Sequence, residues 1–281
     1  MRRPAVVSLV VLVAVGLTVG GYAVWTLTNR PPTPIDERCS ATVGDQTTTI
    51  TIEQAGNAAI IAGVSVKRGL APRAASIALT TAYQESGLRN LDYGHSDSLG
   101  LFQQRPSKGW GTKEQVMDPW YSSTAFYKAL VRVKNWQTRD IGDAAQAVQR
   151  SAYPDAYAKH VANARALASS LAGETPASFT CALRTAGPAD PDGMQTFLAK
   201  TYGNTATLAR DGDALKVTTS NAAAAWSVAQ AAVATTKQYG VGSVTVGGYS
   251  WTYAPWSTPK WLATAPAADT TTVTITFPPP K

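Results

Sequence analysis

Apolar residues recur at intervals of three and four along one long segment of the chain, and this helical period constrains the fold more than any other feature. The segment lies between two proline-rich breaks, residues 30–34 and 184–193. Within it, Pro72 suits the first turn of a helix and Gly87 suits the left-handed position after a helix end. We therefore predict five helices around one long connection, residues 89–117. The predicted helices are residues 55–64, 72–87, 119–133, 144–151 and 157–171.

The sequence after the second break has a mixed pattern. Residues 271–277 alternate threonine with Val273, Ile275 and Phe277, which is the period of a half-buried strand. Two glycines between short β-prone runs predict a hairpin over residues 243–253. Further predicted elements are a strand over 214–218 and helices over 192–202 and 222–238, the last with one apolar face. We therefore expect a mainly α domain, residues 39–183, a linker, 184–191, and a small α+β domain, 192–281.

The start of the chain has a membrane signature. Arg2 and Arg3 precede an uncharged run rich in Val, Leu and Ala, residues 5–27, and about 20 apolar residues suffice to cross a bilayer. The two arginines favour a cytoplasmic N-terminus. We therefore predict a cytoplasmic tail (1–4), a single transmembrane helix (5–27) and a proline-rich stalk (28–38), with the bulk of the chain outside the cell membrane. A cleaved signal peptide is the alternative, although no clean cleavage site follows the run, and both interpretations export the rest.

The chain has two cysteines, Cys39 and Cys181, at the edges of the predicted helical domain. Outside the cytoplasm an isolated pair most simply forms a disulfide, and two buried free thiols are the alternative. The net charge of +7 and the pI of about 9.4 suit an acidic polymer of a bacterial wall or an anionic membrane surface. The basic residues are spread singly rather than in runs, so we do not expect nucleic acid as a partner.

Glu85 is the residue whose surroundings best suit chemistry. It lies just before the predicted end of a helix, where the partial negative charge of the helix disfavours a carboxylate. Apolar neighbours such as Ala82 and Leu88 add desolvation, and both effects raise the pKa of a carboxyl group. A carboxyl that stays protonated near neutral pH can protonate the leaving oxygen of a glycosidic bond. Taken alone, a glutamate at a helix end is more often a solvated side chain.

Two short motifs change that balance. Glu85-Ser86 is followed by Gly100-Leu101-Phe102-Gln103, and the pair resembles the Glu-Ser and Gly-Leu-Met-Gln motifs of the lytic transglycosylase and goose-type lysozyme superfamily. The string from Tyr83 to Gly111 is similar to a group of exported, membrane-anchored actinobacterial proteins with this domain. The resemblance covers roughly residues 54–171. It implies a lysozyme-like fold for the helical domain and the glycan strands of peptidoglycan as the substrate.

The resemblance also implies roles for individual residues. Glu85 matches the catalytic acid, and Ser86 matches the residue that orients it. Gly100 would leave room for substrate beside the backbone, and Gln103 would present its amide to the cleft. In a third motif, Ala-Tyr-Asn, Gln149 replaces the asparagine and the aromatic residue is missing. Further substrate-binding candidates, three of them aromatic residues on which sugar rings can stack, are Gln104, Trp110, Tyr121 and Tyr153.

The second catalytic group stays open at this stage. Most glycosidases use two carboxylates, and Asp97, just before the second motif, is a better candidate than Asp92. Asp97 can equally well cap the turn beside Ser96 and Ser98. In the lytic transglycosylases that the chain resembles, one glutamate serves as acid and then as base while the 6-hydroxyl of the substrate closes an anhydro ring. We favour that reaction over hydrolysis.

Other chemistries find little support in the sequence. His95 and His160 are the two histidines, and no cluster has the spacing of zinc ligands, so we expect neither a metal nor another cofactor. Two alternative functions stay open. The missing aromatic of the third motif suits a non-catalytic peptidoglycan-binding or scaffold protein. The second domain could instead bind a protein partner through an aromatic surface made by Trp226, Trp251, Trp256 and Trp261.

Overall fold

Helices α2 and α3 have ends that the local sequence fixes. The computed structural model describes residues 35–150, 154–264 and 269–278. Helix α2 (Ile52–Lys67) begins after Thr51, whose side chain forms a reciprocal capping box with Gln54. Helix α3 (Pro72–Ser86) begins with its proline and ends at Gly87, which has a φ of 63°. Both boundaries of α3 agree with the sequence-based prediction.

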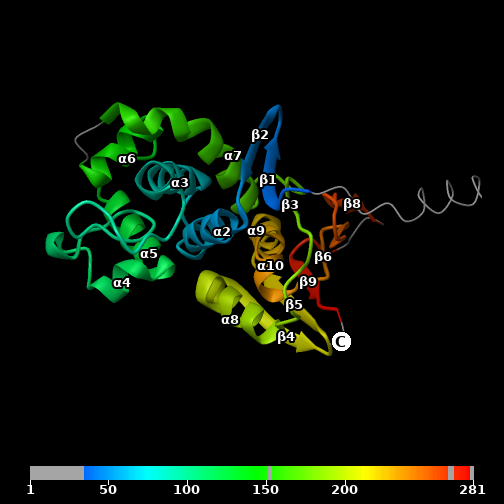
Figure 1. Ribbon diagram of the computed structural model, residues 1–281. Coiled ribbons are helices and arrows are strands. Elements are labelled where there is room, and N and C mark those ends of the chain that lie inside the picture. Colours follow the sequence, from blue (N-terminus) through cyan, green and yellow to red (C-terminus); the bar gives the residue numbers. More distant parts are fainter. Residues whose placement is uncertain (1–34, 151–153, 265–268, 279–281) are drawn as a thin grey trace, which may run out of the picture. The chain divides into compact units, whose positions relative to one another are not determined.

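Helix α3 is the central helix of the first part of the chain. It packs against α2, α5 (Pro119–Leu130), α6 (Ile141–Gln149) and α7 (Val161–Leu171), as Figure 1 shows. Its buried face carries several alanines, which let neighbouring helices approach closely. The structure differs from the prediction at several other helix ends. Helix α5 stops at Leu130 rather than residue 133, and the predicted helix over 157–171 begins as a 3-10 helix, η2 (Pro154–His160).

The long connection after α3 has structure of its own. It contains a short 3-10 helix, η1 (Pro106–Lys108), and a five-residue helix, α4 (Lys113–Met117). Helix α4 starts at a second capping box, in which Thr112 and Gln115 exchange hydrogen bonds. Further back, the backbone groups of Leu99 and Gln104 pair with each other in both directions. The connection is therefore a folded loop that crosses the end of α3.

A small antiparallel sheet closes one side of the helices. Its strands are β1 (Arg38–Val43), β2 (Gln46–Ile50) and β3 (Phe179–Ala182), in the order β2-β1-β3. Cys39 and Cys181 face each other across β1 and β3 and form the disulfide that the sequence predicted. These three strands were not predicted from the sequence. Arg38, which was predicted to end the stalk, begins β1.

A larger antiparallel sheet forms from the second part of the chain. Its order is β4-β5-β9-β6-β7-β8, so the last long strand, β9 (Thr272–Thr276), lies between β5 (Ala214–Thr219) and β6 (Ser243–Val246). The predicted strand near residues 271–277 and the predicted hairpin are both present. The remaining strands are β4 (Ala206–Asp211), β7 (Tyr249–Thr252) and β8 (Leu262–Ala263).

Helix α9 (Ala222–Ala234) joins the two parts of the fold. One side packs on β5, β6 and β9, and another packs on α2 and α7 (Figure 1). Every residue from Ala224 to Ala234 is therefore buried, which corrects the expectation of a single apolar face. Gly173, after α7, permits this contact, because a Cβ there would lie 1.8 Å from the carbonyl oxygen of Ala223.

The described residues form a mixed α+β structure with one shared hydrophobic core. The described residues from Ile35 onward belong to one compact unit, and the core runs from the first helices through α9 into the larger sheet. The predicted linker, 184–191, thus connects segments that share that core. It leads into α8 (Pro191–Tyr202), which is followed by the 3-10 helix η3 (Gly203–Thr205), while α10 (Thr236–Tyr239) follows α9.

The predicted anchor lies outside the described residues. The tail, the transmembrane run 5–27 and most of the stalk precede residue 35, where the described part begins. Within that part, none of the helices combines the length and the apolar character needed to span a bilayer.

Most of the tryptophans in the second part of the chain serve packing. Trp226 and Trp251 are buried, and Trp261 is half-buried against the core. The indole nitrogens of Trp251 and Trp261 donate to Thr180 and to the carbonyl oxygen of Phe179, so both rings tie the larger sheet to β3. Trp256, which is 40% exposed, is the one of the four that presents a large surface. The predicted aromatic surface is therefore reduced to a single exposed ring.

Candidate active site

Glu85 lies half-buried at the last turn of α3. The hydroxyl of Tyr157, from η2, donates a hydrogen bond to Glu85 Oε1 over 2.5 Å. Burial raises the pKa of Glu85 above its ordinary value, and hydrogen bonds from Tyr157 and Gln149 oppose that rise. The net direction is upward. The structure thus places a carboxyl group with a raised pKa at the position that the sequence selected.

Ser86 connects the two motifs. Its hydroxyl is buried and lies within hydrogen-bond distance of the carbonyl oxygens of Ala82 (3.0 Å) and Leu101 (2.7 Å). The bond to Leu101 ties the end of α3 to the Gly-Leu-Phe-Gln segment. Ser86 therefore fixes the loop beside Glu85, and its hydroxyl hydrogen-bonds backbone carbonyl oxygens rather than the carboxyl group.

The structure gives Gly100 a different role from the expected one. Gly100 has a φ of 75°, and a Cβ at this position would lie 2.3 Å from the carbonyl oxygen of Val116. The space beside this glycine is thus filled by the backbone of α4 rather than left for substrate. The glycine at position 100 is required for the close approach of two loop segments, and a contact of Gly100 with substrate stays a prediction.

Gln103, the last residue of the second motif, and Gln104, which follows it, have different surroundings. Gln103 lines the groove described below, and its amide nitrogen is held by the carbonyl oxygens of Tyr93 and Gly100, at 3.2 and 3.3 Å. Its backbone has a φ of 48°, an uncommon conformation that costs of order 1 kcal/mol and that the surrounding loop maintains. Gln104, by contrast, is buried and donates to the carbonyl oxygen of Ser122. Gln104 thus belongs to the interior, and its predicted contact with substrate is not supported.

Two side chains beyond the long loop reach the acid. Gln149, at the last residue of α6, hydrogen-bonds Glu85 and also donates to the carbonyl oxygen of Phe102 over 2.7 Å. It therefore links α6, the second motif and the carboxyl group. Tyr157 is fully buried and supplies a phenol hydroxyl that the sequence analysis missed. The third motif lacks its aromatic residue, but Tyr157 follows it by a few residues. That nearby tyrosine was the signal in the sequence that could have identified this hydroxyl. Tyr153, the predicted one, lies outside the described residues.

Glu85 lines a groove with a volume of about 1210 Å³. The aromatic rings of Trp110 and Tyr121 line it, as does Gln103, so both described aromatic candidates lie where a sugar could contact them. Glu85 is the only carboxylate among the described lining residues. The basic lining residues are Arg105, Lys108, Lys128, Arg132 and Arg150.

Asp97 is held by the loop that follows it. Its carboxylate accepts hydrogen bonds from Arg105 Nε (2.7 Å) and from the backbone and hydroxyl of Ser107 (2.7 and 2.9 Å). The bonds from Ser107, with the Arg105 guanidinium, hold the pKa of Asp97 far below its usual range. Neither Asp97 nor the exposed Asp92 is among the residues that line the groove. The alternative prediction for Asp97, that it stabilises the turn, describes these contacts better than a catalytic role does.

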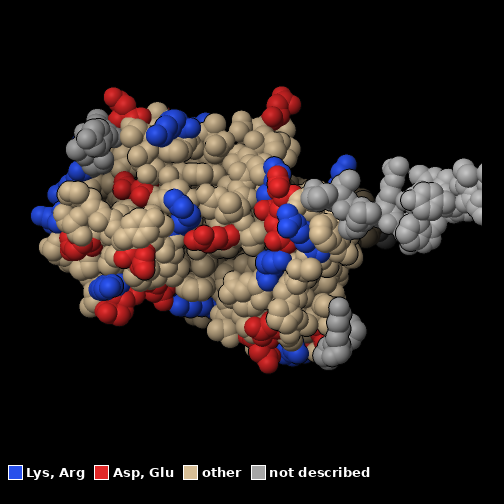
Figure 2. Space-filling model, viewed as in Figure 1, with Lys and Arg blue, Asp and Glu red and all other residues tan. Residues whose placement is uncertain are grey.

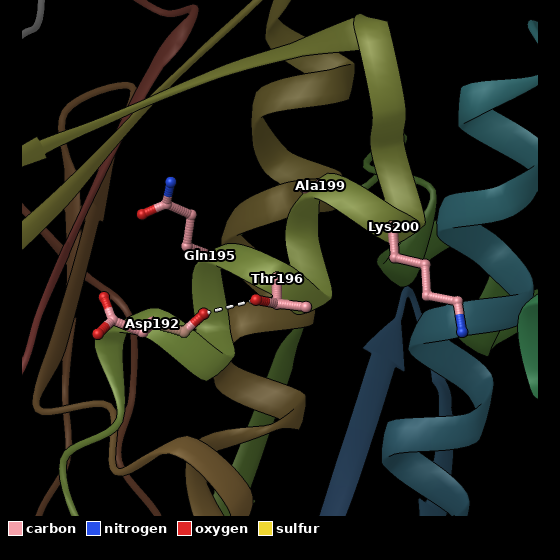
Figure 3. Close-up of a pocket in the computed structure, with 5 residues that line it drawn as sticks. All are labelled: Asp192, Gln195, Thr196, Ala199 and Lys200. Carbon is pink, nitrogen blue, oxygen red and sulfur yellow. Dashed lines mark hydrogen bonds between the residues drawn. The ribbon is translucent and has the colours of Figure 1, made fainter.

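A second hollow lies on α8, away from these residues. Figure 3 shows its lining side chains, Asp192, Gln195, Thr196, Ala199 and Lys200. Lys200 extends away from Asp192 and Gln195, and its ammonium group donates to Asp118 Oδ2 over 2.7 Å. The hydroxyl of Thr196 donates to the carbonyl oxygen of Asp192. The side chains of Thr196 and Lys200 are thus engaged within α8 and with Asp118.

Comparisons with known proteins do not assign the chain to a family. No protein-family model matches the sequence, and no curated protein matches it. Among the described residues, no group of histidine, cysteine and carboxylate side chains could hold a metal ion. The features of the site that bear on its chemistry are Glu85, its two hydrogen-bond partners and the groove.

Proposed function

We propose that the chain cleaves the glycan strands of peptidoglycan, with Glu85 as general acid and then as general base. One observation carries the proposal: a half-buried carboxyl group with a raised pKa forms part of the wall of a groove of about 1210 Å³. A groove of this size has room for several sugar rings, and aromatic side chains line it. A raised pKa extends to higher pH the range over which a carboxyl stays protonated and can donate its proton.

The proposed reaction needs a single carboxyl group. Glu85 gives its proton to the glycosidic oxygen as the bond from that oxygen to C1 breaks. The ionised Glu85 then takes the proton of the 6-hydroxyl of the same sugar, whose oxygen forms a new bond to C1. The products are one strand with a free 4-hydroxyl and one with a 1,6-anhydro ring, and no water is consumed. Hydrolysis is the runner-up, and it would place a water where the 6-hydroxyl attacks.

The absence of a second lining carboxylate among the described residues favours the anhydro-forming reaction. Retaining and inverting hydrolysis each use a second carboxylate, as nucleophile or as base for water. Asp97, the best candidate for that group, is already bound to Arg105 and Ser107. A reaction in which the substrate supplies its own nucleophile does not need such a group.

Tyr157 and Gln149 position the acid in this mechanism. Both bind Glu85 and oppose the upward shift of its pKa, so they limit how strongly the carboxyl holds its proton. They also stabilise the carboxylate that forms after the first proton transfer. The third motif, in α6, lacks its aromatic residue. We propose that Tyr157, from η2, takes the place of that residue beside Glu85.

The proposal extends to the fold and to the location of the protein. We assign a lysozyme-like domain to residues 39–183 and a single-pass membrane anchor to residues 5–27, with the bulk of the chain outside the cell membrane. The disulfide between Cys39 and Cys181 supports export, because such bonds persist in oxidising compartments. In this arrangement the groove reaches wall strands near the membrane surface.

The test uses the full chain in a non-ionic detergent and purified sacculi as substrate. Glu85→Gln keeps the size of the side chain and removes the acid, and Glu174→Gln, at an exposed position, is the matched control. We expect soluble muropeptides from the parent and from Glu174→Gln, and none from Glu85→Gln. Mass analysis then separates the two reactions, because anhydro ends and reducing ends differ by one water. If Glu85→Gln digests sacculi as fast as the parent, Glu85 is not the acid.

A non-catalytic wall-binding protein is the second candidate, and one observation favours it. Two side chains bind the carboxyl of Glu85, which stabilises the charged form, and a charged carboxyl cannot protonate a leaving oxygen. This candidate predicts that the chain sediments with sacculi but releases no product at any pH. Failure to sediment with sacculi would remove it.

A further inference from the structure

The groove that contains Glu85 carries an unbalanced positive charge. Five basic side chains line it, against one carboxylate among the described lining residues. Arg105 is paired with Asp97. The other four, Lys108, Lys128, Arg132 and Arg150, are exposed and form no ion pair with a described residue. On the molecular face shown in Figure 2, acidic and basic side chains are interspersed.

These cations do not serve to tune the acid. The pKa of Glu85 is governed by burial and by hydrogen bonds from Tyr157 and Gln149, and no basic side chain is among its causes. Nearby cations would lower the pKa of a carboxyl group and so weaken a general acid. The burial and hydrogen bonds that set the pKa of Glu85 thus leave the basic side chains of the groove without a role in tuning the acid.

Helix stability also does not explain the set. Lys128 lies in the last turn of α5 and Arg132 follows its end, where a cation interacts favourably with the helix dipole. That reason does not apply to Lys108, which ends a three-residue 3-10 helix on the opposite loop. Three separate elements thus contribute free cations to one groove, and an anionic occupant would compensate all of them.

We infer that the groove selects glycan strands that carry anionic substituents, and that Lys128 and Arg132 bind the carboxylates of the stem peptides on neighbouring sugars. The inference rests on the proposed function, since it names the form of the glycan that the same groove accepts. Lysine offers a compact charge, and arginine offers a planar donor pair that matches a carboxylate. Neutral glycan strands lack this interaction.

Carboxylates fit the proposed reaction better than phosphodiesters do. Ring closure consumes the 6-hydroxyl of the sugar that is cleaved, so a phosphodiester on that oxygen would block the reaction. Stem peptides are attached through the lactyl group on C3 of the muramic acid and leave the 6-hydroxyl free. A strand that carries stem peptides thus combines negative charge with an intact nucleophile.

The experiment measures binding to sacculi by co-sedimentation and product release by mass analysis, both with the full chain in detergent. The test variant is Lys128→Gln/Arg132→Gln. The control is Arg210→Gln/Lys216→Gln, which removes the same charge from exposed positions on β4 and β5. Each protein meets three substrates: untreated sacculi, sacculi whose carboxylates are converted to neutral methylamides with carbodiimide and methylamine, and sacculi stripped of phosphodiester-linked polymers with hydrofluoric acid.

We expect the test variant to bind untreated sacculi roughly three- to tenfold more weakly than the control, which is the range for two exposed ion pairs. The difference should vanish on methylamidated sacculi and persist on acid-stripped sacculi. A difference that vanishes only on acid-stripped sacculi would assign the cations to phosphodiesters and overturn the inference. Equal binding by test and control variants on untreated sacculi would also overturn it.

The two proposals fail separately in this design. Binding is measured in the parent and in the Glu85→Gln background, so it does not depend on turnover. If Glu85→Gln still releases muropeptides, the proposed function is wrong whatever the cations do. If Glu85→Gln is inactive and the test variant binds and cleaves like its control, the function stands and the inference about carboxylates is wrong.

Discussion

Tyr157→Phe tests how the fold sets the acidity of Glu85. The substitution keeps a buried aromatic ring and removes the hydroxyl that lies 2.5 Å from Glu85 Oε1. That hydrogen bond favours the ionised carboxylate, so its loss should raise the pKa of Glu85 further. A general acid works only while protonated, and the fall in rate at high pH should therefore move to higher pH.

The size of the effect follows from the chemistry of the bond. A hydrogen bond to a charged group contributes about 1.5 to 3 kcal/mol, and each 1.4 kcal/mol corresponds to a factor of about ten. Tyr157 binds the carboxylate that forms during the reaction, so its loss should lower the maximal rate about ten- to a hundredfold. The same change should lower the free energy of unfolding by about 1 to 2 kcal/mol, because a half-buried oxygen loses a partner.

The assay is muropeptide release from sacculi across pH, together with urea unfolding of each protein. Tyr127→Phe is the control, since Tyr127 is also fully buried and its hydroxyl donates to the carbonyl oxygen of Ile61 over 2.8 Å, away from Glu85. It should lose similar stability and keep the parent pH profile. The reasoning fails if Tyr157→Phe leaves the profile in place or moves it to lower pH, or if Tyr127→Phe moves it equally.

Three other predictions follow from the site and the disulfide. Gly100→Ala should destabilise the fold by about 2 to 4 kcal/mol, since its Cβ would meet Val116 and its φ is 75°; urea unfolding measures this, and an unchanged midpoint would contradict it. Replacing Cys39 and Cys181 by serine should lower the free energy of unfolding by about 4 to 5 kcal/mol, from the loop entropy for a separation of 142 residues. Thermal unfolding with and without reductant checks this. Glu85→Gln should gain stability relative to the parent as pH rises. Because the folded pKa of Glu85 is raised, the folded state binds more protons than the unfolded one, and stability is lost as pH rises from 4.5 through the folded pKa. Parallel pH–stability curves for the two proteins would contradict this.

Local signals explain which parts of the fold the sequence predicts. The limits of α3 follow from Pro72 and Gly87, whose backbone preferences act within one turn. The alternation of Val273 and Ile275 likewise predicts β9 without knowledge of its neighbours. The disulfide was predictable because the compartment and the number of cysteines left few options.

Features that depend on distant partners were not predictable from the same sequence. Strands β1 and β3 are joined across more than a hundred residues, and neither has a strong alternating pattern of its own. Helix α9 is rich in alanine, which packs against a sheet and against helices equally well, so its sequence does not reveal that both sides are covered. The close approach of Gly100 to Val116 was not predictable either, because Val116 lies in α4, a short helix within the predicted connection.

The candidate site likewise has one residue that local sequence predicts and partners that only the fold reveals. Glu85 was found from its position at a helix end and the motif beside it, both of which are local. Its controlling partners, Gln149 and Tyr157, come from elements 64 and 72 residues further on, and only the fold brings their side chains to its carboxyl. Burial raises the pKa of Glu85 and these donors lower it, so neither the glutamate nor its motif determines that pKa alone. A chain with the same two motifs but no donor at position 157 would carry the same acid at a higher pKa, so burial and the phenol hydroxyl together, rather than the motif alone, set the acidity of Glu85.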